Sequence, residues 1–255
     1  MLTKLPNPYN VLIVGANRGI GLGMVRHFCA DMRVGQIFAA CREPSTATEL
    51  HALAEHDCRL RAMRMDVEDD QTVADATAEI LRFGGVLHAV IVTAGVLHDD
   101  GMRPERRLAD IDVAAAERSF RVNALGPLLV LKHVEPLLRQ SGGPAYFASI
   151  SARVGSIGDN RIGGWYSYRA AKAAQNQSVH TASIELARRH SELTCVTLHP
   201  GTVDTALSEP FQGRVKPEKL FSVERASRQL LTVLDGLGAK DSGGFFAWDG
   251  QPIPW

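Results

Sequence analysis

Short apolar segments alternate with amphipathic segments along the whole chain, and this alternation limits the folds open to it. Short apolar runs fit buried strands, whereas apolar positions repeated every three to four residues fit helices. Because parallel strands need a crossover connection, the pattern predicts a doubly wound, mainly parallel sheet with helices on both faces. No linker or repeat divides the chain, so we expect one α/β domain over residues 1–255. The seven expected strands cover residues 10–14, 35–41, 60–65, 89–93, 145–149, 193–198 and 243–248.

The expected helices occupy segments between these strands, at residues 19–29, 46–55, 69–82, 113–138, 168–189 and 222–237. The third of them carries acidic residues in its first turn, where they interact favourably with the helix dipole. The fourth reads as one long helix, but Pro127 and Pro136 should bend or interrupt it because proline has no backbone N–H.

The composition excludes several classes of partner. The chain has 28 basic and 28 acidic residues, so its formal net charge is zero and neither a nucleic-acid nor a membrane-surface partner is expected. No apolar stretch approaches the roughly 20 residues that span a bilayer, and the first residues lack a signal core, so we expect a cytoplasmic protein. The cysteines are scattered without a CxxC pair, which indicates reduced thiols rather than a disulfide framework or a metal site; they are Cys29, Cys41, Cys58 and Cys195.

A glycine-rich turn joins the first strand to the first helix. Its residues are Gly15, Ala16, Asn17, Arg18, Gly19, Ile20 and Gly21. Glycines let the backbone approach a pyrophosphate closely, and a helix N-terminus offers free N–H groups and partial positive charge. Because the turn follows a strand and opens a helix near the start of the chain, it predicts nucleotide binding.

Tyr168 and Lys172 stand four residues apart in an alanine-rich helical segment. Residues at this spacing share one helix face, so a phenol and an ammonium are held side by side. A nearby cation favours phenolate, and we expect it to lower the tyrosine pKa from about 10 so that the group exchanges protons near neutral pH. The alternative is an ordinary helix surface with one aromatic residue and one lysine at helical spacing.

The glycine spacing and the Tyr-x3-Lys pair together resemble the short-chain dehydrogenase/reductase family in its one-domain form. Further segments resemble the family's motifs in the same order along nearly the whole chain. Thr93-Ala94-Gly95 matches the Ala-Gly that ends the fourth strand, although the family's preceding asparagines are absent. Asn123 matches a helix asparagine, and the segment 200–205 matches a cofactor-covering segment. Residues 151–169 and the last ten residues look like the C-factor and sniffer-like carbonyl reductase subgroup, and a Rossmann-type fold is implied.

The resemblance implies hydride transfer between a nicotinamide and a carbonyl or alcohol carbon. Tyr168 would protonate the developing alkoxide, Lys172 would lower the Tyr168 pKa and hold the nicotinamide ribose, and Asn123 would anchor a water in a proton relay. The implied cofactor-binding residues are these three together with Gly15, Asn17, Arg18, Gly19, Ile20, Gly21, Arg42, Asp66, Val67, Thr93, Ala94, Gly95, Pro200, Gly201, Val203 and Thr205.

A serine that binds the substrate oxygen would complete the catalytic set. The family often has two consecutive serines, of which the second is catalytic, and that second position here is Ala152. Ser151 is the nearest hydroxyl, and we take it as the catalytic serine. Ser149 lies on the same strand face and is the second choice. The alternative for Ser151 is a strand-end hydroxyl that bonds to local backbone.

Arg18 and Arg42 favour NADP(H) over NAD(H) as the cofactor. Arg18 precedes the second glycine of the turn, and Arg42 follows the second strand, where an NAD-selecting enzyme usually carries an acid. A guanidinium pairs with a 2′-phosphate, whereas a carboxylate repels it. Glu43, one residue later, is the opposing feature. Asp66 ends the third strand, where the resemblance implies a contact with the adenine amino group; capping of the next helix is the alternative.

These features predict an NADP(H)-dependent carbonyl reductase or alcohol dehydrogenase with a small-molecule substrate and a substrate lid at about residues 205–220. Trp165, Tyr166 and Arg161 are expected near the substrate mouth, unless the two aromatic residues only pack the loop. The resemblance leaves a homodimer or homotetramer open. The alternative function is a nucleotide-binding signalling or regulatory protein, C-factor-like, with little or no turnover. A sugar-nucleotide epimerase also uses Tyr-x3-Lys but usually has an added substrate domain, for which this chain has little room.

Overall fold

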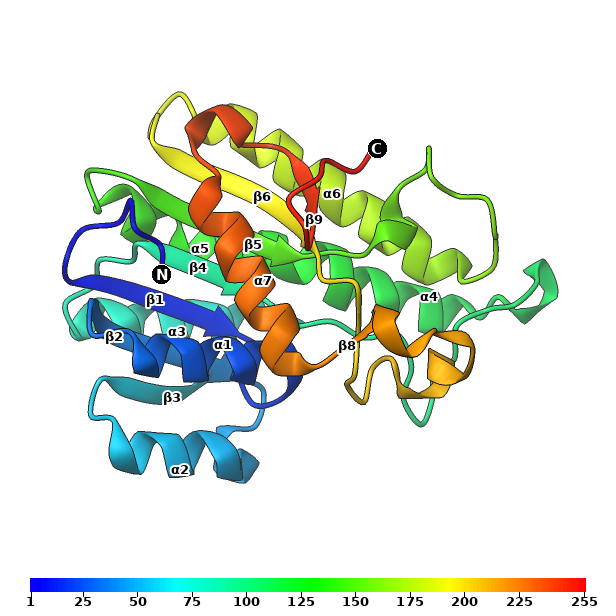
Figure 1. Ribbon diagram of the computed structural model, residues 1–255, viewed down its shortest axis with the longest axis horizontal. Helices are drawn as coiled ribbons and strands as arrows, with labels where there is room; N and C mark the ends of the chain where they lie inside the picture. Colours follow the sequence, from blue (N-terminus) through cyan, green and yellow to red (C-terminus); the bar gives the residue numbers. More distant parts are fainter.

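A seven-stranded parallel sheet forms the centre of the molecule (Figure 1). The structure is a computed structural model that describes the backbone of residues 1–255 and every side chain except that of Arg214. The strand order is β3-β2-β1-β4-β5-β6-β9, so the order reverses at β1, as in a doubly wound sheet. This confirms the predicted fold class. The strands are β1 (Tyr9–Val14), β2 (Val34–Cys41), β3 (Leu60–Arg64), β4 (Ala89–Val92), β5 (Ala145–Ile150), β6 (Leu193–His199) and β9 (Phe245–Ala247).

Helices cover both faces of this sheet. One face carries α1 (Gly19–Ala30), α2 (Thr48–His56) and α7 (Val223–Gly236), and the other carries α3 (Asp70–Arg82), α5 (Gly126–Arg139) and α6 (Tyr166–Leu186). Strand residues alternate between the two cores: Val11 and Ile13 belong to one, Leu12 and Val14 to the other. Burial on both faces explains why the strands are apolar at nearly every position.

The longest expected helix is interrupted. α4 (Val113–Phe120) is followed by a π-helical turn, η3 (Arg121–Leu125), and α5 begins at Gly126, whose N–H bonds to the carbonyl five residues back. Pro127 has no N–H to donate to the carbonyl four residues back, so the α-helical bonding pattern fails just before it. The predicted interruption at Pro127 is therefore confirmed, whereas Pro136, the other proline expected to disturb the helix, lies inside α5.

The other boundaries differ from the expected ones by at most three residues, the largest difference being the end of α6 at 186 rather than 189. Thr93 moves from the expected end of the fourth strand into the loop after β4, and Tyr166 moves from the expected loop into the first turn of α6. Short turns of 3₁₀ helix supplement the main elements at Pro44–Thr46, Leu108–Asp110, Arg153–Gly155, Glu209–Arg214, Pro217–Lys219 and Ala239–Asp241.

A small second sheet, absent from the prediction, joins the two ends of the segment that follows β6. Its strands, β7 (Thr202–Val203) and β8 (Leu220–Phe221), pair in parallel. The segment between them lies beyond the carboxyl ends of the strands, near α4 (gold in Figure 1). In the part of the chain that the structure describes, no helix is long and apolar enough to cross a membrane.

Candidate active site

The glycine turn lies at the carboxyl end of β1, where the strand order reverses. Gly15 has a φ of +88°, and a Cβ there would lie 2.7 Å from the Ala94 nitrogen. A Cβ on Gly21 would collide with the Gly15 carbonyl oxygen. Thr93 holds the two loops together, because its hydroxyl lies 2.9 Å from the Val14 oxygen and 3.1 Å from the Gly15 oxygen. These close approaches hold the glycine turn compactly at the N-terminus of α1, the arrangement that binds a dinucleotide pyrophosphate.

Two further segments adjoin this turn. A Cβ on Gly19 would lie 3.3 Å from the Thr205 side chain, so the start of the expected lid faces the glycine turn. Gly201 has a φ of +78°, and a Cβ there would lie 2.7 Å from the Phe221 ring. Val67 packs against Gly126 at the start of α5. The structure therefore brings the predicted lid segment to the glycine turn, while Val67 serves helix packing.

The expected 2′-phosphate residues are both exposed. Arg18 occupies the N-cap position of α1, and Arg42 follows β2. Neither forms an ion pair among the described residues, so both guanidinium groups are free to bind an anion. Asp66 does not cap α3: the side chain of Asp69 does, accepting from two backbone N–H groups. The capping alternative for Asp66 is thus excluded, and its carboxylate accepts only the Glu68 N–H at 3.0 Å.

Tyr168 and Lys172 lie one turn apart in α6, and both are buried. The Lys172 Nζ is 5.7 Å from the centroid of the Tyr168 ring. Their exposed fractions are 8% and 3%. Lys172 Nζ donates to the Ile150 carbonyl oxygen at 2.9 Å, which fixes the second turn of α6 on the carboxyl end of β5. The interpretation of this pair as an ordinary helix surface is therefore wrong.

Burial controls the protonation of this pair in the free protein. It raises the pKa of the Tyr168 phenol well above its usual value and lowers the pKa of Lys172 to about 7. The expected lowering of the tyrosine pKa is thus wrong for the free protein, because burial disfavours the charged phenolate and is the cause that shifts this pKa. At neutral pH Tyr168 carries its proton.

Asn123 lies in the π-helical turn and is fully buried. Its side-chain amide forms two hydrogen bonds with the backbone of Val96, in the loop after β4. Oδ1 accepts the Val96 N–H at 3.1 Å, and Nδ2 donates to the Val96 oxygen at 2.8 Å. A Cβ on Gly95 would lie 3.1 Å from Asn123 Oδ1 and 3.8 Å from Lys172 Nζ. Asn123 and Lys172 therefore face each other across Gly95, and the π turn directs the asparagine inward.

The two candidate serines differ in their hydrogen bonding. Ser149 is buried, and its Oγ accepts from the Gln175 side chain. Ser151 is 2% exposed, and its Oγ has no hydrogen-bond partner among the described residues. A buried hydroxyl without a partner has a hydrogen bond to offer a ligand. This difference favours Ser151 over Ser149 for contact with a substrate, and it argues against the strand-end alternative.

Glu105 organises the start of α6 and was not predicted. Its carbonyl oxygen accepts the Trp165 N–H, and its carboxylate accepts the Ser167 N–H at 3.3 Å together with the Ser167 hydroxyl. Trp165, the N-cap residue, has a left-handed backbone with a φ of +53°, which a bulky residue rarely adopts. Glu105 compensates by placing a buried negative charge at the helix N-terminus, one turn before Tyr168. No sequence signal could identify it, because it lies in a loop sixty residues or more from Trp165 and Ser167.

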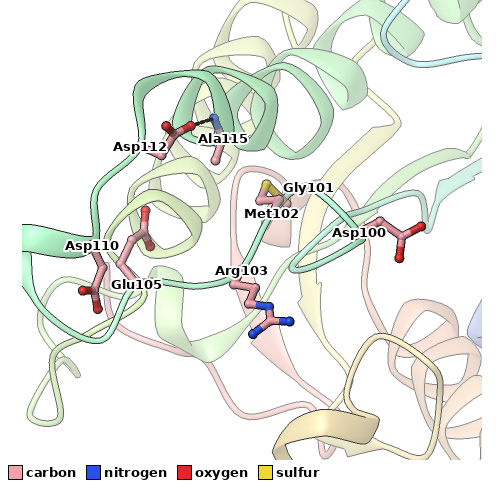
Figure 2. A pocket seen from close by; sticks show the side chains of 8 residues that line it. All are labelled: Asp100, Gly101, Met102, Arg103, Glu105, Asp110, Asp112 and Ala115. Atoms are coloured by element: carbon pink, nitrogen blue, oxygen red, sulfur yellow. Dashed lines mark hydrogen bonds between the residues drawn. The ribbon is translucent and has the colours of Figure 1, made fainter.

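A cavity of about 260 Å³ adjoins this contact (Figure 2). Half of the residues in its wall are acidic; the wall is formed by Asp100, Gly101, Met102, Arg103, Glu105, Asp110, Asp112 and Ala115. Met102, Arg103 and Glu105 also line a narrower space that reaches Tyr168. The loop after β4 thus forms one side of the surroundings of the tyrosine.

Aromatic residues form the side toward the lid. The Trp165 ring packs edge-on against Tyr168 and against Phe211, with centroids 6.2 and 4.9 Å apart. His98 contacts the Phe211 ring as well, and its Nε2 lies 3.1 Å from the Ala206 oxygen. Trp165 and His98 therefore both contact the segment 205–220 that the sequence predicts as a lid.

We expect Glu105→Ala to lower the free energy of unfolding by about 2 kcal/mol, because it removes a buried helix cap and leaves the Trp165 turn unsupported. Glu105→Gln should cost less, since an amide oxygen still accepts from Ser167. Thermal unfolding of both variants, with the exposed Glu55→Ala as a control, measures this. Equal stability of Glu105→Ala and the control would contradict the assigned role.

This fold and this site define a dinucleotide-dependent enzyme class, and the chain belongs to the short chain dehydrogenase family, whose model matches residues 9–215. C-signal from Myxococcus xanthus is 39% identical over 148 residues, which are 58% of this chain and 83% of that protein. An NADPH-bound carbonyl reductase from chicken fatty liver has a TM-score of 0.88 and 30% identity, covering 99% of this chain and 96% of the other. The carbonyl reductase Sniffer of D. melanogaster has a TM-score of 0.86 and 27% identity, covering 96% and 99%. The predicted family resemblance is thus confirmed.

Proposed function

We propose that this protein is an NADP(H)-dependent oxidoreductase that transfers a hydride between the nicotinamide and a small carbonyl or alcohol compound. The observation that carries the proposal is the buried pair of Tyr168 and Lys172, together with a compact glycine turn at the N-terminus of α1. Family membership supports the reaction class, and the similarity to an NADPH-bound carbonyl reductase supports the cofactor.

The bound nicotinamide would supply or accept the hydride. Gly15, Gly19 and Gly21 would hold the pyrophosphate on the α1 N-terminus. Arg18 and Arg42 would pair with the 2′-phosphate, which explains why neither has an ion-pair partner among the described residues. The remaining contacts would come from Asn17, Ile20, Asp66, Val67, Thr93, Ala94, Gly95, Asn123, Pro200, Gly201, Val203 and Thr205.

In carbonyl reduction, Tyr168 Oη donates its proton to the developing alkoxide. Its raised pKa keeps the phenol protonated at neutral pH, so the acid is loaded before substrate binds. Ser151 Oγ, buried and unbonded, donates a hydrogen bond to the same oxygen. Lys172 would bind the nicotinamide ribose, and Asn123 would anchor a water that relays protons from Lys172 to solvent. The segment 205–220 of this single domain closes over the substrate, with Phe211 against Trp165.

The test is a screen of aldehydes and ketones for NADPH oxidation by the purified protein. We expect saturable reduction of at least one compound and slower rates with NADH. Saturable NADPH binding without turnover of any carbonyl or alcohol would reject the proposal.

That outcome would favour the second candidate, a nucleotide-binding signalling protein. Its specific support is the similarity to C-signal over 148 residues and the alanine at position 152. The intact group of Tyr168, Lys172 and Asn123 favours the enzyme instead, since a protein that only binds a nucleotide has no need of a buried proton donor.

Ser151→Ala is expected to lower kcat/KM for carbonyl reduction about 100-fold, because the substrate oxygen loses a positioned donor. Ser149→Ala should have the smaller effect, since the Ser149 hydroxyl is already engaged by Gln175. Steady-state kinetics of the two variants decides the assignment, and a larger loss in Ser149→Ala would reverse it.

We also propose that the protein works in the cytoplasm as a homodimer or homotetramer. Apolar side chains are exposed on two helices, with Phe120 of α4 at 37% and Ile184 of α6 at 54% exposure. Light scattering coupled to gel filtration measures the mass, and a monomer at micromolar concentration would contradict the assembly.

A further inference from the structure

A buried amide lies directly behind the catalytic lysine. Gln175 is 1% exposed and follows Lys172 by three residues on α6. Its Oε1 accepts a hydrogen bond from Lys172 Nζ at 2.9 Å. Its Nε2 donates to the Ile150 carbonyl oxygen at 3.2 Å and to the Ser149 hydroxyl. Gln175 thus joins the lysine to the end of β5.

The chemistry of its neighbours allows only one orientation of this amide. A backbone carbonyl can only accept a hydrogen bond, so the NH₂ group must face Ile150. An ammonium can only donate, so the amide oxygen must face Lys172. The two requirements are met together, and rotating the amide by half a turn would break both. Gln175 therefore presents a permanent acceptor to Lys172.

This acceptor also determines where the ammonium points. Of the three Lys172 N–H donors, one is directed to Ile150 and one to Gln175, both at 2.9 Å. The aliphatic part of the side chain is confined too, because a Cβ on Gly155 would lie 2.8 Å from the Lys172 Cβ. One N–H is left, and Gly95 and Asn123 lie near the same nitrogen: a Cβ on Gly95 would be 3.8 Å from Lys172 Nζ and 3.1 Å from Asn123 Oδ1.

We propose that Gln175 is a positioning residue of the reaction: it keeps the Lys172 ammonium charged in a buried site and directs its third N–H toward the cofactor ribose. This inference rests on the proposed function. Lys172 is taken out of water on all sides, so each acceptor that replaces water favours its charged form. Without Gln175, only the Ile150 oxygen would remain, and the lysine would lose its proton more readily.

The surroundings of Lys172 make its titration simple to read. Tyr168 on the same helix is the titratable group that faces it. The elements packed around it contribute Ser149, Asn123, Gly95 and Gly155, none of which titrates. Burial is the only cause that shifts the Lys172 pKa, to about 7. Because Gln175 accepts a hydrogen bond from the charged form of Lys172, its removal should lower this pKa further.

The first experiment measures the Lys172 titration in the full-length free protein by NMR of ¹³Cε-labelled lysine, with the signal assigned from Lys172→Met. We expect Gln175→Met to lower the midpoint by about one pH unit, because a hydrogen bond to a charged group is lost. Gln175→Glu should raise it by at least as much, since a carboxylate then faces the ammonium. Gln177→Met, which changes an exposed glutamine on the same helix, should leave it unchanged.

The second experiment measures the pH dependence of kcat/KM for carbonyl reduction with the same variants. A charged Lys172 is required, so activity falls as pH rises through the Lys172 pKa. The pH at which activity falls should be lower in Gln175→Met and higher in Gln175→Glu than in the wild type. Equal NMR midpoints in wild type, Gln175→Met and Gln175→Glu would overturn the inference, as would a loss of activity in Gln175→Met that is the same at every pH. If the wild type reduces no carbonyl, the proposed function fails, whereas the titration still decides the role of Gln175.

Discussion

Tyr168→Phe is expected to lower kcat for carbonyl reduction by about 10⁴-fold, because it removes the proton donor and leaves the ring in place. Phenylalanine keeps the edge-on packing against Trp165, so the fold of the site should persist. NADPH affinity should change by less than about threefold, since the substitution leaves the proposed contacts of the glycine turn, Arg18 and Arg42 with the cofactor untouched. Single-turnover kinetics and fluorescence titration with NADPH measure the two quantities separately.

The matched control is Tyr166→Phe, which removes the hydroxyl of a neighbouring tyrosine with 38% exposure and should retain nearly full activity. Loss of NADPH binding in Tyr168→Phe would mean that the tyrosine serves structure rather than proton transfer. A fully active Tyr168→Phe would refute the catalytic assignment outright.

The strands and the glycine turn were predictable because each follows from a local pattern. A parallel strand buried on both faces must be apolar, and Gly15 and Gly21 are required where a Cβ would strike the opposing backbone. The Tyr168–Lys172 pair was predictable from helical spacing together with the glycine turn and the family resemblance, since spacing alone also fits an ordinary helix surface. Their protonation was not, because spacing does not reveal how deeply a helix face is buried, and burial reverses the expected direction of the Tyr168 pKa.

Residues that act through long-range contacts were missed for a similar reason. Glu105 reaches α6 from a loop, and its partners can be found only once the chain is folded. Gln175 did leave a signal, since a position three residues after Lys172 lies near it on the helix, but a glutamine at such a position is ordinarily part of a solvated surface. The π turn at Asn123 arises from Pro127, yet a proline in a helical pattern indicates a disturbance without specifying its form.

The cofactor preference supplies the second large effect. Arg42→Asp is expected to lower the ratio of kcat/KM with NADPH to that with NADH by about 10³-fold, roughly 4 kcal/mol. The substitution removes a charge-assisted pair with the 2′-phosphate and places a carboxylate where it repels that group but can accept a hydrogen bond from a ribose hydroxyl. Because Arg42 is exposed and forms no ion pair among the described residues, the fold should not be affected.

Glu43→Gln provides the opposite test at the neighbouring position. Its carboxylate is exposed and engaged with the Ser45 hydroxyl, and removing this charge should raise the NADPH preference modestly, by about threefold. Steady-state kinetics with both cofactors at one ionic strength gives all the ratios. An unchanged ratio in Arg42→Asp would reject Arg42 as the 2′-phosphate contact. Arg18 would then be the remaining candidate, and Arg18→Ala should abolish the preference for NADPH because it removes the other exposed guanidinium group at the proposed site.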